Sequence, residues 1–289
     1  MRKVSILLLI FFALSFYIRS DHSFDQDLGR HIKLGEIIVK THQVPKVNLF
    51  SYTHPDFPFV NTHWLFEVIA YWFSQTLGLQ VFLLLKIIIL LVSVWLILRI
   101  IPKENEALLL PVGFIFLHVL RERMELRPEI FSFLFTASTY FILERYLTSA
   151  TKLIYLLPFI QLLWINTHIY FFIGLLLQVI FIIHKREKIL GIIFILSVLV
   201  SLINPNGIAG FLYPLNVTKN YGYTIVENQT MFFLESINFQ DPNFLFVKIS
   251  LAIATLSIIV SLIRKKLNLS NILLLFFITA CNFSKFWTN

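Results

Sequence analysis

One stretch of the sequence decides the class of fold: residues 81–101 read VFLLLKIIILLVSVWLILRII. Only Lys86, Ser93 and Arg99 interrupt its apolar side chains. An α-helix rises about 1.5 Å per residue, so about 20 residues cross the roughly 30 Å hydrocarbon core of a bilayer. The stretch is therefore predicted to be a transmembrane helix.

The composition of the whole chain agrees with a membrane protein. Of the 289 residues, 57% are hydrophobic and only 14% are Asp, Glu, Lys or Arg, whereas soluble domains carry about 25% charged residues. These values exclude a disordered chain and an ordinary cytosolic enzyme. The single cysteine, Cys281, excludes an intrachain disulfide and a cysteine metal cluster.

Further apolar runs before and after residues 81–101 predict about nine spans in a single membrane-embedded domain over residues 1–289. The first run follows Met1-Arg2-Lys3 and lacks a small-residue cleavage pattern, so we interpret it as an uncleaved helix. We expect an all-α fold, a polytopic transmembrane helical bundle. The predicted spans are 4–18, 81–101, 107–120, 130–146, 153–166, 169–183, 189–203, 244–263 and 269–286.

The basic residues indicate how these spans are oriented. With a cytoplasmic N-terminus and one crossing per run, ten Lys and Arg fall in inner loops and five in the outer loops after the first. The positive-inside rule requires this bias. Because such clusters account for the net charge of +8, we expect no nucleic-acid partner. The inner ten are Arg99, Lys103, Arg145, Lys152, Lys185, Arg186, Lys188, Arg264, Lys265 and Lys266, and the outer five are Arg121, Arg123, Arg127, Lys219 and Lys248.

Two long segments then lie outside, residues 19–80 and 204–243, and the first is expected to carry interfacial helices. The run 64–73 would reverse the charge bias if it crossed, so we interpret it as a helix in the outer interface, where Trp and Tyr are favoured. Lys86 is expected to extend outward to the membrane surface. Nearly all polar surface available for chemistry is therefore on one side.

Acidic residues just after the first span are candidate catalytic groups. Asp25 and Asp27 flank one residue, and His31 follows Asp27 by one helical turn, on the same helix face. A carboxylate here can act as general base toward a hydroxyl, or both can hold a divalent cation, Mg or Mn, beside a phosphate. The alternative is that Asp27 caps the helix that begins at Leu28. Both interpretations stay open.

Other polar residues on the outer side have a structural interpretation beside the functional one. Arg121, Arg123 and Arg127 can bind phosphate oxygens through their planar guanidinium groups, or can pair with the three glutamates among them. For further candidates the alternatives are a structural carboxylate or a helix cap. These candidates for an acceptor or loop site are His63, Glu67, Asn166 and His168.

In chain order, these motifs resemble bacterial polytopic glycosyltransferases of the GT-C superfamily, over roughly residues 1–265. The first outer segment is similar to the first extracytoplasmic loop of that superfamily, and three later motifs are similar to later motifs. The first set is Asp25-Gln26-Asp27-Leu28-Gly29-x-His31, Gly35, Pro45, Phe50-Ser51-Tyr52-Thr53 and His63-Trp64-Leu65-x-Glu67. The later set is Leu126-Arg127-Pro128-Glu129, Trp164-x-Asn166-x-His168 and Asn204-Pro205-x-Gly207.

The resemblance implies an enzyme of the bacterial cytoplasmic membrane whose active face is extracytoplasmic. It would transfer a sugar from a polyprenyl-phosphate donor to a lipid, glycan or protein acceptor. Asp27 or Asp25 would be the base, and some members of the superfamily use a divalent metal. The three arginines and His31 would bind the donor. Members of the superfamily run to several hundred residues, so the resemblance also implies that this chain is shortened at its C-terminus.

Two other functions remain alternatives. A polysaccharide polymerase is the nearest enzymatic alternative. A transporter or flippase of lipid-linked saccharides would place polar residues on broken helices near the middle of the membrane. The predicted spans carry few ionisable groups, which disfavours the transporter.

The orientation can be tested with single cysteines in a Cys281→Ser background. A membrane-impermeant maleimide should label a cysteine at Ser51 in intact cells and leave one at Thr151 unlabelled, because the charge bias puts these residues on opposite sides. Labelling at Thr151 without labelling at Ser51 would invert the proposed orientation.

Overall fold

The computed structural model describes residues 2–18, 24–101, 103–120, 125–216 and 231–265, with residues 268, 269, 271 and 273. Over these ranges the regular structure is helical, with two isolated β-bridges, Phe24–Leu126 and Val47–Pro58, and no strands. The prediction of an all-α fold is therefore confirmed.

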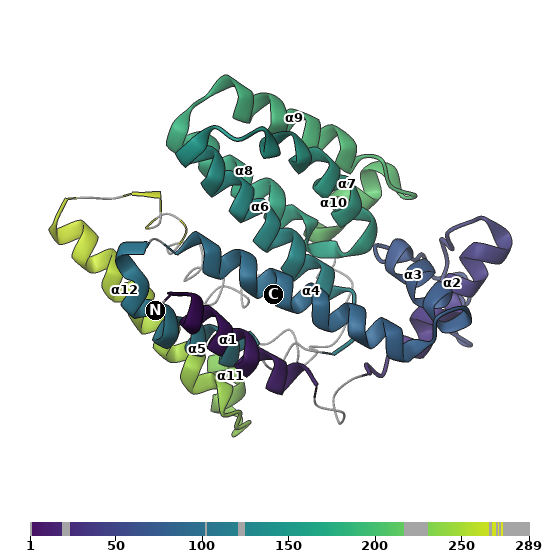
Figure 1. Cartoon of the computed structure of the whole chain (residues 1–289). Helices are drawn as coiled ribbons and strands as arrows, with labels where there is room; N and C mark the ends of the chain where they lie inside the picture. Colours follow the sequence, from purple (N-terminus) through teal and green to yellow (C-terminus); the bar gives the residue numbers. More distant parts are fainter. Residues whose placement is uncertain are drawn as a thin grey trace. The chain divides into compact units, whose positions relative to one another are not determined.

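The α-helices in chain order are α1 (Arg2–Tyr17), α2 (Leu28–Thr41), α3 (Trp64–Gln75), α4 (Leu79–Ile100), α5 (Leu109–Leu120), α6 (Glu129–Ser149), α7 (Leu157–Thr167), α8 (Phe172–Lys185), α9 (Lys188–Ser201), α10 (Gly207–Asn216), α11 (Met231–Ser236) and α12 (Asn243–Ile263) (Figure 1). Short 3₁₀ helices precede three of them: η1 (Lys103–Leu108), η3 (Lys152–Leu156) and η4 (Ile169–Phe171).

The apolar runs predicted the positions of these helices well. Eight of the nine predicted spans coincide within a few residues with α1, α4, α5, α6, α7, α8, α9 and α12, where α7 and α8 include their preceding 3₁₀ turns. The ninth, 269–286, lies almost entirely outside the described residues. The interfacial helix predicted at 64–73 corresponds to α3.

The predicted number of membrane spans finds less support in the lengths of these helices. In the described part of the chain, two helices are long and apolar enough to cross a membrane, α4 and α12. The apolar helices at 105–120, 152–167, 169–185 and 188–201 are shorter, and a 16-residue helix measures only about 24 Å. A bundle of about nine spans is thus not confirmed, although the helices themselves are present.

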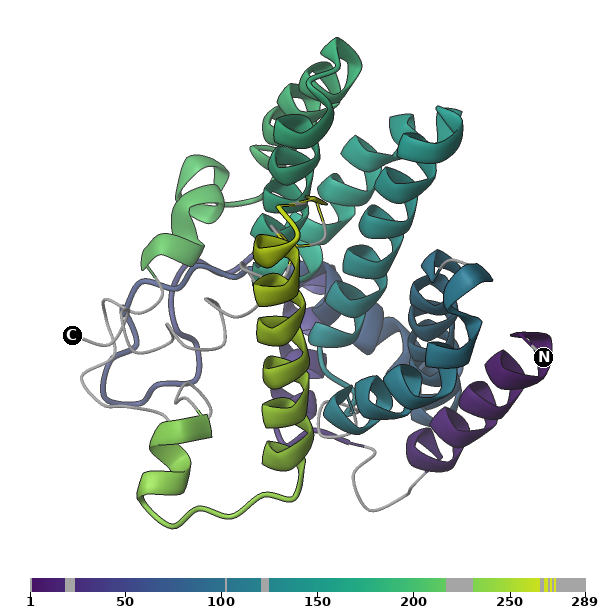
Figure 2. The same cartoon turned by 90° about the vertical axis from the view of Figure 1, so that its left-hand side faces the viewer.

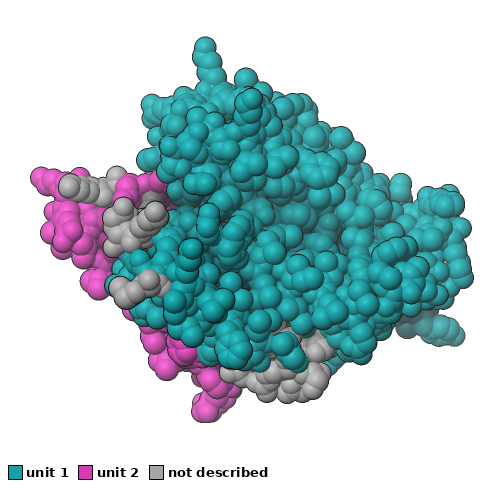
Figure 3. All heavy atoms as spheres, in the orientation of Figure 1, with its two compact units in different colours: residues 1–113, 123–214 teal, residues 114–122, 215–289 magenta. Residues whose placement is uncertain are grey.

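The chain divides into two compact units (Figure 3). The first comprises residues 1–113 and 123–214, and the second comprises residues 114–122 and 215–289. In the second unit, the His118 ring stacks on Phe246 with centroids 4.2 Å apart. All candidate site residues that the structure describes belong to the first unit.

Within the first unit, α4 packs along α6, and α7 packs along α9 (Figures 1 and 2). Aromatic and aliphatic side chains of α6 and α7 fill the space between helices, with Trp164 fully buried beside Phe135, Ile165 and Phe171. Lys86 on α4 is also buried. The expectation that Lys86 extends outward is therefore wrong, because its side chain lies on the face of α4 that packs into the unit.

Within residues 24–75, helices α2 and α3 pack closely against each other. His42, in the left-handed region with φ of 55°, ends α2, and a turn-rich connection without helix follows as far as His63. Gly35 on α2 faces the backbone of Glu67 on α3, where an added methyl group would overlap the Glu67 carbonyl. The two helices can approach this closely only because residue 35 has no side chain.

Gly35→Ala is therefore expected to destabilise the protein by about 1–3 kcal/mol through overpacking. The measurement is thermal unfolding of the purified protein in detergent. Gly29→Ala is the matched control, since no atom lies within 4 Å of an added methyl group at that position of the same helix. Equal unfolding temperatures for the two variants would contradict the α2–α3 packing.

Candidate functional site

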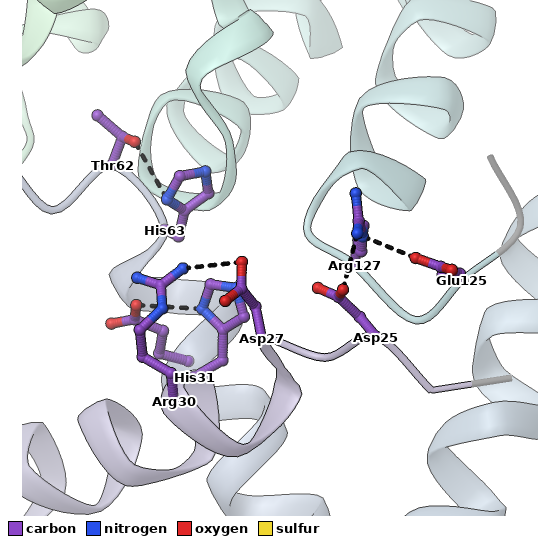
Figure 4. A network of polar contacts seen from close by, with 9 residues as sticks. Asp25, Asp27, Arg30, His31, Thr62, His63, Glu125 and Arg127 are labelled. Atoms are coloured by element: carbon purple, nitrogen blue, oxygen red, sulfur yellow. Dashed lines mark hydrogen bonds and ion pairs between the residues drawn. The ribbon is translucent and has the colours of Figure 1, made fainter. Parts of the chain in front are cut away.

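Polar side chains from segments far apart in the sequence meet at one place in the first unit. We call this group the polar cluster: His31 on α2, Asn61 and His63 just before α3, Glu67 on α3, Ser132 on α6 and His168 just after α7. The ion pairs of Asp25 and Asp27 lie beside it (Figure 4).

Glu67 lies at one end of the polar cluster and is 1% exposed. Its Oε2 accepts a hydrogen bond of 2.6 Å from the Asn61 side-chain amide, and its Oε1 lies 3.3 Å from His31 Nδ1. A carboxylate buried this deeply requires such partners. The contacts agree with the structural interpretation of Glu67, which the sequence left open.

The three histidines of the polar cluster lie in a row. The ring centroids of His31 and His63 are 5.9 Å apart, and those of His63 and His168 are 5.3 Å apart. No group of three or more His, Cys, Asp and Glu residues within the described ranges is arranged to hold a metal ion.

A chain of hydrogen bonds leads from Trp164 through Ser132 to His168. Trp164 Nε1 donates to Ser132 Oγ over 2.8 Å, and Ser132 Oγ lies 2.7 Å from His168 Nδ1. Because an indole nitrogen can only donate, the Ser132 hydroxyl is free to donate to Nδ1. We assign the proton of neutral His168 to Nε2 on this basis.

Burial holds His63 and His168 in the neutral form. Burial, with a smaller effect of His31, lowers the pKa of His168 to about 3. Burial lowers the pKa of His63 well below 6.5, and His168, His31 and Arg30 act in the same direction. At neutral pH these rings offer hydrogen bonds without charge.

The two candidate catalytic aspartates have opposite environments (Figure 4). The Asp25 side chain is 3% exposed, and its Oδ1 forms an ion pair of 2.8 Å with Arg127 Nη2. Asp27 is 61% exposed, and its Oδ2 lies 3.4 Å from Arg30 Nη2. The two carboxylates are thus engaged by different arginines, and a divalent cation shared between them stays a prediction.

Two expectations about Asp27 can be compared with this geometry. Asp27 occupies the N-cap position of α2, but its side chain makes no capping hydrogen bond. The capping interpretation therefore has no support from the observed contacts. His31, which the sequence places on the same helix face as Asp27, turns its Nδ1 toward Glu67.

Arg127 joins the start of the described segment 24–75 to the start of α6. Besides Asp25 it contacts Glu125, with Nε and Oε2 2.9 Å apart, and the bridge between Phe24 and Leu126 runs alongside. These contacts are the internal pairing that the sequence left as an alternative to phosphate binding. Arg121 and Arg123 lie outside the described residues.

Asn166 connects three segments through all its polar atoms. Its Oδ1 accepts a 2.7 Å hydrogen bond from Trp64 Nε1, and its Nδ2 donates to the carbonyls of Leu162 and Ile203. A role in binding an acceptor stays a prediction, but the amide is already bonded within the protein. Asn206 Nδ2 likewise donates to the Asn61 carbonyl over 3.2 Å.

An apolar groove of about 440 Å³ opens beside Asn166. Its walls come from α3, α7 and the turn after α9, and only two asparagines interrupt its apolar lining. The lining residues are Trp64, Leu65, Leu162, Leu163, Asn166, Ile203, Asn204 and Pro205.

Two members of the polar cluster, Asn61 and Ser132, differ in how easily they can be identified from the sequence. Asn61 belongs to the same short motif as His63 and Glu67, so its neighbours pointed to it. Ser132 lies within an apolar run with no distinguishing pattern, and only the folded chain brings it to His168.

Comparisons with family models, with curated proteins and with solved structures gave no match to this chain.

The neutral state of His168 predicts a loss of stability in acid. Its folded pKa of about 3 lies below the ordinary 6.5, so the unfolded chain binds the proton first as pH falls. The contribution is complete above pH 6.5 and decreases toward pH 3, by on the order of 2 kcal/mol between pH 7 and pH 5. His168→Asn should reduce the fall in unfolding temperature over that interval.

The control for this measurement is His54→Asn, since His54 lies on the exposed part of the 42–63 connection. It should keep the pH dependence of the unmodified protein. Parallel curves for His168→Asn and the unmodified protein would show that His168 is not held neutral by the fold.

Proposed function

We propose that this protein is an integral membrane glycosyltransferase that transfers a sugar from a polyprenyl-phosphate donor to a lipid, glycan or protein acceptor. The observation that carries the proposal is the meeting of the GT-C-like motifs. The segments around Asp27, His63, Arg127, His168 and Asn206 contribute to one site, although hydrogen-bonded partners such as Asn61 and Asn206 are 145 positions apart.

Asp27 is the residue to which we assign the general base. An acceptor hydroxyl is a poor nucleophile, so a positioned carboxylate takes its proton as the oxygen attacks the sugar carbon. The bond from that carbon to the phosphate oxygen breaks, and polyprenyl phosphate leaves. Asp27 is exposed and makes no capping bond, whereas the buried Asp25 is bound to Arg127. Asp27 is therefore the carboxylate that an acceptor can reach.

The surroundings of the site suit a donor that is a membrane lipid. Helix α4 is long and apolar enough to cross a bilayer, and the groove beside Asn166 has the apolar lining that a prenyl chain requires. The positive-inside bias and the resemblance both support a site on the outer face of the bacterial cytoplasmic membrane.

The experiment is sugar transfer by the purified full chain from a panel of polyprenyl-phosphate sugars, compared with its Asp27→Asn variant. The substitution preserves size, and Asn is as favourable as Asp at the N-cap position. The variant is expected to lose roughly 10² to 10⁴ in rate, the usual worth of a general base, with an unchanged unfolding temperature.

Asp56→Asn is the matched control, because Asp56 is an exposed aspartate on the 42–63 connection, and it should retain full transfer. Full activity of Asp27→Asn would remove the assigned base. If the unmodified protein transfers no sugar from any donor of the panel, the proposed function is wrong.

A further inference from the structure

Basic side chains gather where α6 and α8 end and α9 begins. Residues 144–152 and 184–188 hold five Lys and Arg against two Glu, and residues 153–183 between them hold no charged residue. Ser132 of the polar cluster and Arg145 both belong to α6 and are about 20 Å apart along its axis, so this group is separate from the candidate site. We call it the basic edge: Arg145, Lys152, Lys185, Arg186 and Lys188.

Contacts between the α8–α9 turn and the end of α6 bring the basic edge together. The Tyr146 hydroxyl donates a hydrogen bond of 2.5 Å to Glu187 Oε2, and Lys185 Nζ lies 3.0 Å from Glu187 Oε1. The same ammonium lies 5.1 Å from the centre of the Tyr146 ring, within the range of a cation–π contact. Arg145 and Arg186 are chain neighbours of these bonded residues, so they lie at the same end of the helices.

The acids of this region leave most of the positive charge unneutralised. Glu187 uses its two carboxylate oxygens on Tyr146 and Lys185, and Glu144 is hydrogen-bonded to Tyr140. In the part of the chain that the structure describes, no carboxylate forms an ion pair with the other four cations of the basic edge, and all four are exposed. These four are Arg145, Lys152, Arg186 and Lys188.

We propose that the basic edge binds the phosphate headgroup of an anionic phospholipid. Arginine offers a planar fork that matches two phosphate oxygens, and lysine adds a point charge. Clusters of Lys and Arg beside membrane helices attract anionic headgroups in this way. The ligand is a bulk lipid and not a sugar donor, and the inference does not rest on the proposed function.

Apolar side chains next to these cations favour a lipid over a free phosphate. Leu153 and Tyr155, which are 41% and 59% exposed, follow Lys152, and Ile183, which is 57% exposed, precedes Lys185. A molecule with an anionic head and acyl chains can contact both kinds of side chain, and tyrosine is favoured at the membrane–water interface. The predicted orientation puts this edge at the cytoplasmic leaflet, whose surface potential is negative.

The test is thermal unfolding of the purified full chain in detergent micelles with dioleoyl phosphatidylglycerol or dioleoyl phosphatidylcholine. The anionic lipid should raise the unfolding temperature more than the zwitterionic lipid at equal mole fraction, because it binds the folded state. The double variant Arg186→Gln/Lys188→Gln should weaken the apparent Kd for phosphatidylglycerol by about tenfold or more. Both side chains are exposed, so its unfolding temperature without lipid should not change.

Lys33→Gln/Lys40→Gln is the matched control. It removes the same amount of positive charge from two exposed lysines of α2 that pair with Glu36, and it should leave the apparent Kd for phosphatidylglycerol unchanged. Equal weakening by the two double variants would show that only the net charge matters and would overturn the site.

Two further results overturn the inference: no preference of the unmodified protein for phosphatidylglycerol, or normal binding of that lipid by Arg186→Gln/Lys188→Gln. An equal rise in unfolding temperature with glycerol 3-phosphate at the same concentration overturns the lipid as the source of the phosphate. The experiment involves no sugar transfer, so its outcome is independent of the activity assay of Asp27→Asn.

Discussion

The buried carboxylate of Glu67 is the interaction on which the rest of the site depends. A negative charge away from water must have donors around it, and Asn61 and His31 supply them from two different segments. Asn61 also accepts a hydrogen bond from Asn206 through its main-chain carbonyl. One desolvated acid thus determines how α2, α3 and the turn after α9 meet, and the row of histidines follows from that meeting.

The carboxylates of this region have been given different properties by their surroundings. Glu67 and Asp25 are buried and paired, Glu125 is partly exposed, and Asp27 lies at the surface beside Arg30. Environment, and not residue type, separates a structural acid from a reactive one. The first two hold segments together, whereas the Asp27 carboxylate is open to solvent.

The sequence was sufficient to predict where most helices lie, because long apolar runs bounded by charged residues leave few other possibilities. It could not predict which face of a helix packs against its neighbours. For that reason Lys86 was expected at the membrane surface, whereas its side chain is buried. Nor could local spacing predict that His31 would contact Glu67, which is 36 positions away, in preference to Asp27 one turn before it. Ser132 became part of the site through long-range packing, which leaves no local mark in an apolar run.

The hydrogen bond between Asn61 and Asn206 also has a consequence for biosynthesis. Ribosomes add roughly 5–20 residues per second, so the 145 positions between these partners correspond to about 7 to 29 seconds of translation. During that time the α2–α3 hairpin exists without its partner from the turn after α9. Assembly of the site is therefore a late event in the life of the nascent chain, and the main-chain carbonyl of Asn61 must stay hydrated until the turn after α9 has been made.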